Sequence, residues 1–139
     1  MVRIWSVYHG NFDGLGFGEM VITEGLAVVF SSMVAKNEPL NQPESALFMT
    51  EENLRFCVKH RDALIAEVLD HWQEPYETEL MSRYMIGSFE WKDGRPTRIG
   101  YFVGAEIVKA VLAKGIDICA LTRMPTAEIM NLFHAVYAS

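Results

Sequence analysis

The segment 19–36 is apolar on almost every side, yet it has an acidic residue, Glu24, near its middle. Read as an α-helix, it places apolar residues three and four positions away from Glu24 in both directions: Met20, Val21, Ala27 and Val28. A helix that is apolar all round is expected to be buried on nearly all of its surface. The chain must therefore fold around this helix and cover it with other apolar elements.

The carboxylate of Glu24 needs compensation in such a helix, because burying an unpaired charge strongly disfavours folding. It can be protonated, hydrogen-bonded, paired with a cation or bound to a metal ion. Arg3, Arg98 and Lys109 are the cations that we expect to reach Glu24 in three dimensions. We favour the ion pair for the chain as it stands, with a metal ligand as the alternative.

Helical patterns dominate the rest of the chain and predict an all-α (mainly α) fold of about five helices. Besides 19–36, helices are expected at 51–72 with Thr50 as the N-cap, 76–86, 99–114 and 125–137. The dipeptide Asp93-Gly94 is typical of a tight turn, so a small hairpin or an ordered loop is expected near residues 88–98. Segments 10–18 and 37–44, which contain glycines or prolines, are expected to be loops.

Length and charge limit the class of protein. A chain of 139 residues is expected to form a single helical domain, residues 1–139, that buries about two thirds of its unfolded surface. The net charge is −6 and basic residues are scattered, which argues against binding to nucleic acid or to an anionic membrane surface.

Hydropathy and cysteine use bear on partners and location. Half of the residues are apolar and the mean hydropathy is +0.11, which favours a homo-oligomer or a complex with another protein chain. We expect no membrane span, because no stretch approaches 18 uninterrupted apolar residues. The two cysteines form no CxxC motif and the N-terminal residues do not resemble a secretion signal, so a cytoplasmic location is expected.

Two short motifs resemble parts of a known family. Glu24-Gly25-Leu26-Ala27 and the segment 98–104, which reads Arg-Ile-Gly-Tyr-Phe-Val-Gly, are similar to predicted HExxH zinc-dependent proteases of the gluzincin-like type. In that family a Glu-Gly-Leu-Ala helix supplies the glutamate that completes a site of two histidines and one carboxylate, and a Gly-Tyr-x-x-Gly helix follows. The resemblance implies that Glu24 is a zinc ligand and that Tyr101 lies beside the cleft, where it would donate to a developing oxyanion.

Packing offers a simpler explanation for parts of the second motif. Tyr101 can be a packed aromatic residue without any catalytic role. Gly100 and Gly104 are four residues apart, so they leave one stripe of the expected helix bare and permit another backbone to approach closely.

The HExxH motif itself is missing from the 139 residues. In that motif two histidines four apart bind the zinc ion and the glutamate activates water. Because the motif precedes the Glu-Gly-Leu-Ala helix in the family, the chain resembles the C-terminal part of such a peptidase, with HExxH expected at or before Met1. The histidines present do not replace it: His60 and His71 would be about 16 Å apart along one helix, and His9 and His134 are expected to be structural.

Two hypotheses follow, and they leave open whether the chain is an enzyme. The first is a metallopeptidase-like helical domain, non-catalytic as given and without a cofactor, that acts as a scaffold or interaction module. The second is a fragment of a zinc-dependent peptidase whose HExxH helix is supplied upstream or by another chain, with Glu24 as ligand and Tyr101 as donor. We favour the first for the chain as written.

Overall fold

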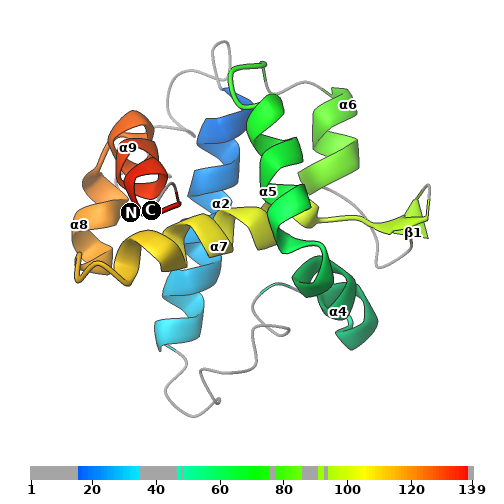
Figure 1. Ribbon diagram of the computed structural model, residues 1–139, viewed down its shortest axis with the longest axis horizontal. Helices are drawn as coiled ribbons and strands as arrows, with labels where there is room; N and C mark the ends of the chain where they lie inside the picture. Colours follow the sequence, from blue (N-terminus) through cyan, green and yellow to red (C-terminus); the bar gives the residue numbers. More distant parts are fainter. Residues whose placement is uncertain are drawn as a thin grey trace.

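The computed structural model describes residues 16–34, 47, 49–75, 78–85, 91–92 and 94–137. Within these residues the fold is mainly α, as predicted (Figure 1). The longer helices are α2 (Phe17–Val34), α5 (Arg61–Asp70), α7 (Ile99–Leu112) and α9 (Thr126–Tyr137), and the shorter ones are α4 (Glu51–Lys59) and α8 (Ile118–Arg123). A single helical turn, α6 (Thr78–Leu80), continues into the π-helix η1 (Met81–Met85). Arg3, His9 and the loop expected at 37–44 lie outside the described residues.

Helices α2 and α7 form the centre of the molecule, and α7 runs across the middle of α2 in Figure 1. They touch through glycine. A Cβ atom added at Gly25 would lie 2.3 Å from the carbonyl carbon of Gly104, and one added at Gly104 would lie 2.3 Å from the carbonyl oxygen of Val21. The two backbones are therefore in direct contact, and the close approach expected at Gly104 is confirmed.

The remaining helices complete the core around this crossing. Helix α7 contacts α5, η1 and α9 as well as α2. Fully buried side chains come from each of these helices: Ile65 and Val68 from α5, Tyr84 and Met85 from η1, and Ile129 and Phe133 from α9. By length and composition alone α2 could also cross a membrane, with a mean hydropathy of 1.5 over 18 residues, but half of it is buried inside the fold. Core helices commonly have this composition.

The sequence-based helix assignments need corrections in three places: within 51–72, at α8 and at the start of α2. The single helix expected at 51–72 is two helices, because the backbone leaves the α-conformation at His60, with φ −108° and ψ 20°. Helix α8 was not expected at all. It follows Gly115, which has a left-handed φ of +90°, a conformation typical of the glycine that ends a helix. Helix α8 has six residues, too few for a periodic pattern.

Other local predictions are confirmed. The side chain of Thr50 caps α4 by accepting a hydrogen bond from the backbone N–H of Asn53 at 3.1 Å. The expected hairpin is formed by β1 (Trp91–Lys92) and β2 (Arg95–Pro96), which pair antiparallel, with Gly94 at a φ of +75°. The start of α2 is the third correction. The helix begins at Phe17, inside the segment 10–18 that was expected to be a loop, and the N–H of Phe17 donates to the carbonyl of Glu74 at 2.8 Å.

A charged cluster fastens the hairpin to α5. The guanidinium of Arg95 donates to both carboxylate oxygens of Glu67, at 2.9 and 2.7 Å, and the hydroxyl of Tyr84 donates to the same carboxylate at 3.0 Å. The hydrogen bonds from Arg95 outweigh partial burial and hold the pKa of Glu67 below its ordinary value. Burial and the neighbouring carboxylate raise the pKa of Tyr84 to about 12. The cluster is a structural anchor in which each polar group has a partner.

Candidate functional site

The glycine contact between α2 and α7 brings the two sequence motifs together. Glu24 stands one residue before Gly25 on α2, and Tyr101 stands three residues before Gly104 on α7. Arg98 immediately precedes α7. These three side chains are close enough to act on one another electrostatically, since the charge of Glu24 raises the pKa of Tyr101 and the charge of Arg98 lowers the pKa of both. The crossing therefore assembles a carboxylate, a phenol and a guanidinium from distant parts of the sequence.

Glu24 is half-buried, less than a helix apolar on every side led us to expect. Burial raises its pKa above the ordinary value, and the positive charge of Arg98 only partly opposes this effect. Within the described part of the chain, Glu24 makes no hydrogen bond and no ion-pair contact. Of the candidate cations, Lys109 pairs with Glu106 at 2.7 Å instead. Arg98 acts on Glu24 through its charge but does not form an ion-pair contact with it, so the favoured ion pair is not formed by either of these two cations.

Tyr101 is also half-buried, and its ring lies against Arg98. The guanidinium carbon of Arg98 is 4.0 Å from the centroid of the Tyr101 ring, which is cation–π geometry. Burial is the main cause that raises the pKa of the Tyr101 hydroxyl, and the charge of Glu24 adds to it, while Arg98 acts in the opposite direction. The hydroxyl therefore stays protonated at neutral pH and is able to donate a hydrogen bond.

Arg98 has an unusual backbone. Its φ of 65° and ψ of 20° are left-handed, and it is the one non-glycine residue with positive φ in the part of the chain that the structure describes. Such a conformation costs on the order of 1 kcal/mol for a residue with a Cβ atom, and it recurs at functional sites. The side chain of Arg98 donates from Nε to the carbonyl of Leu47 at 3.4 Å. No sequence pattern announced this conformation, although Arg98 belongs to the second motif.

The described residues do not form a complete zinc site. A catalytic zinc ion takes three protein ligands and keeps one open position. No group of three His, Cys, Asp or Glu side chains that could hold a metal occurs among the residues with described positions. Glu24, a half-buried carboxylate without a described partner, suits a single oxygen ligand. His71 contacts Glu74, and both His60 and His134 are exposed.

The two motifs belong to a match that extends over nearly the whole chain. A family profile described as a predicted Zn-dependent protease (DUF2268) matches residues 2–131. The chain belongs to this family of predicted Zn-dependent proteases. The family recognised from Glu24 and Tyr101 with their neighbours is thus confirmed at this level, while the HExxH and gluzincin-like assignments stay predictions. No curated protein and no solved structure matches the chain.

Sequence reasoning missed one further charged cluster on α7. Glu106 accepts a hydrogen bond from Nε of Arg61 at 2.9 Å and from Lys109 at 2.7 Å. Lys109 lies three residues along the same helix, so that pair follows from helical spacing. Arg61 is 45 positions away in the sequence, and only the packing of α5 on α7 reveals it.

Proposed function

We propose that residues 1–139 form the carboxylate-bearing helical part of a zinc-peptidase-like protein and are non-catalytic by themselves. In this proposal the helices serve as a scaffold that associates with a second copy or with another protein chain. The observation that carries it is Glu24: the fold presents one half-buried carboxylate beside Tyr101 and Arg98, with no ligand triad among the described residues. Membership in the family supports the peptidase-like ancestry.

A second candidate is favoured by the same carboxylate. Glu24 has no described partner although its burial is unfavourable for the charged form, which is the state expected of a ligand position. If a histidine pair were supplied from outside these 139 residues, zinc would contribute a polarising positive charge. The hydroxyl of Tyr101 would then donate a hydrogen bond to a substrate oxygen, and Arg98 would hold the Tyr101 ring in place.

Metal binding separates the two candidates. The purified 139-residue chain, dialysed against zinc and then against metal-free buffer, is expected to retain far less than one zinc ion per chain and to show no peptidase activity. Glu24→Gln and its matched control Glu128→Gln, at an exposed position on α9, are expected to retain equally little zinc. Stoichiometric zinc that Glu24→Gln loses and Glu128→Gln keeps would overturn the non-catalytic proposal and support the second candidate.

The scaffold role has its own test. Sedimentation equilibrium of the purified chain is expected to show self-association, because large apolar side chains such as Met33, Val34 and Val58 remain exposed. A strictly monomeric chain over the accessible concentration range would leave association with a different protein as the remaining form of the proposal.

A further inference from the structure

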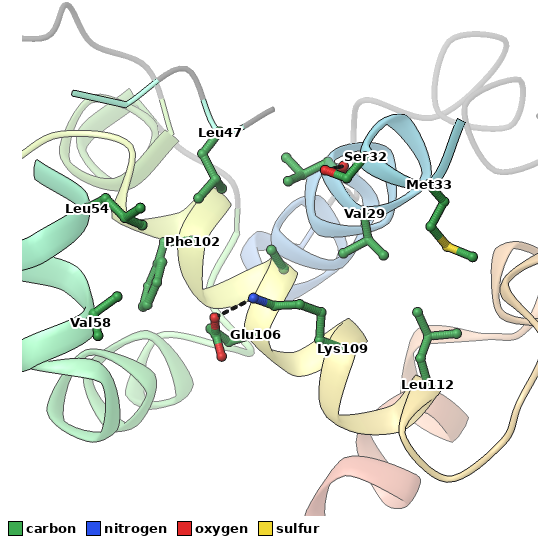
Figure 2. A pocket seen from close by; sticks show the side chains of 12 residues that line it. Val29, Ser32, Met33, Leu47, Leu54, Val58, Phe102, Glu106, Lys109 and Leu112 are labelled. Carbon is green, nitrogen blue, oxygen red and sulfur yellow. Dashed lines mark hydrogen bonds and ion pairs between the residues drawn. The ribbon is translucent and has the colours of Figure 1, made fainter. Parts of the chain in front are cut away.

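A pocket of about 530 Å³ lies between the C-terminal half of α2, α4 and α7 (Figure 2). Its volume falls within the range of about 300–1,000 Å³ that is typical of small-molecule sites. Its walls are mostly aliphatic, and include Val28, Val29, Leu47, Leu54 and Leu112. Among the lining residues that the structure describes, Phe102 is the one aromatic residue. Such walls suit a flexible hydrocarbon chain better than a flat aromatic ligand.

A charged group is placed among these apolar walls. Figure 2 shows the ammonium of Lys109 paired with Glu106 and directed across the pocket between the side chains of α2 and α4. Glu106 is its one described acceptor, so two of the three N–H groups of Lys109 remain for another acceptor. A ligand with a polar end would find its hydrogen-bonding partner here.

The sign of the charge selects an anion. Glu106, whose side chain is only 16% exposed, binds both Lys109 and Arg61, so the three groups have two positive charges and one negative charge. Burial favours the neutral form of Glu106, but the hydrogen bonds and charges of Lys109 and Arg61 prevail and hold its pKa below the ordinary value. Arg61 also pairs with Asp62 at 2.9 Å, and both of these residues lie outside the pocket lining. Of the residues that line the pocket, Glu106 and Lys109 are the charged ones among those described. Because Glu106 is shared between two cations, it neutralises Lys109 only in part, and the ammonium keeps an attraction for an anion.

We propose that this pocket binds an alkyl carboxylate of the medium-chain fatty acid type. The hydrocarbon chain lies among the aliphatic side chains of α2, α4 and α7, and the carboxylate accepts hydrogen bonds from Lys109. Glu106 and Arg61 hold the ammonium in position. The proposal does not depend on zinc or on peptidase activity, because Glu24 and Tyr101 do not line the pocket.

Calorimetric titration with a series of ligands tests the chemistry. Octanoate and decanoate are expected to bind the purified chain saturably, with about fourfold tighter binding for each methylene that enters the pocket. Decanol and decylamine, which keep the chain but lack the anionic end, are expected to bind at least about tenfold more weakly than decanoate. Equal affinity for decanoate and decanol, or no saturable binding of decanoate, would refute the proposal.

Two variants with matched controls test the location. Lys109→Gln is expected to weaken decanoate binding at least about tenfold, whereas Lys114→Gln, at an exposed position beyond α7, leaves it unchanged. Val58→Glu places a repelling charge at an exposed lining residue, and its control is Ala63→Glu, at an exposed position on α5 outside the pocket. Circular dichroism melts verify folding, and Val58→Glu decides the matter if Lys109→Gln unfolds. Unchanged affinity in a folded Val58→Glu chain would place the ligand elsewhere.

Discussion

Replacing Gly104 by alanine is expected to destabilise the fold by about 1–2 kcal/mol, although alanine is the better helix former. The added methyl group would lie 2.3 Å from the carbonyl oxygen of Val21 and 3.1 Å from the Cα of Gly25. Both neighbours are backbone atoms, so no side-chain rotation can relieve the overlap. Helices α2 and α7 must move apart instead.

The size of the effect follows from what that movement disturbs. Alanine gains about 1 kcal/mol over glycine in helix propensity. Against this, overpacking a core costs about 1–3 kcal/mol and sometimes more, and a gap of even 0.5–1 Å forfeits about a quarter to a half of the dispersion energy of each separated contact. Because α2 and α7 have the most extensive contact in the described fold, we expect the loss to exceed the gain clearly.

Urea unfolding followed by circular dichroism at 222 nm measures the change. Gly16→Ala is the matched control, since an added Cβ atom there has nothing within 4 Å. It is expected to leave the free energy of unfolding unchanged or to raise it by a few tenths of a kcal/mol. Gly25→Ala, whose methyl group would meet the backbone of Gly104, is expected to resemble Gly104→Ala. A Gly104→Ala chain as stable as the Gly16→Ala chain would refute the backbone-contact reasoning.

Three further outcomes follow from the structure. Glu24→Gln is expected to leave stability unchanged or slightly higher at pH 7, because burial raises the folded-state pKa of Glu24 and disfavours its ionised form. Thermal melts at pH 7 and pH 4 should show that the extra stability of the variant vanishes at the lower pH, where the wild-type carboxylate takes up its proton. Arg95→Met is expected to cost about 1–2 kcal/mol in urea unfolding. Since Arg95 lowers the pKa of Glu67, the stabilisation is lost as the pH falls through that lowered pKa, and this acid dependence should be weaker in the variant. Thr50→Ala is expected to cost about 1 kcal/mol by removing the cap of α4, whereas Thr50→Ser should retain most of the stability in the same assay.

The elements that were predictable from sequence are those with a local cause. The apolar run around Glu24 predicted α2, the hydroxyl of Thr50 predicted the start of α4, and Gly94 has the left-handed conformation that suits the turn predicted at Asp93-Gly94. The break at His60 has no glycine or proline to mark it. There the arrangement of α4 and α5 in the core overrides a continuous helical pattern.

The site was predictable only in part, because its assembly depends on tertiary packing as well as on local sequence. Glu24 was singled out by its place in an apolar helix, Tyr101 was singled out by resemblance, and the glycine stripe on α7 indicated that some backbone would approach closely. That the approaching backbone is Gly25, inside the other motif, depends on tertiary packing between segments about 80 residues apart. The left-handed backbone of Arg98 and the partnership of Glu106 with Arg61 likewise have no local signal.

The direct contact between Gly25 and Gly104 has a consequence for precision. Side chains elsewhere in the core can change rotamer, or be replaced by others of different size, without altering the separation of two main chains that already touch. The backbone segments that carry Glu24 and Tyr101 are therefore held at a separation that no side-chain rotation can change. Any ligand shared between them, whether a metal ion or a peptide oxygen, would meet side chains that start from two backbones in fixed contact, which favours a preorganised site.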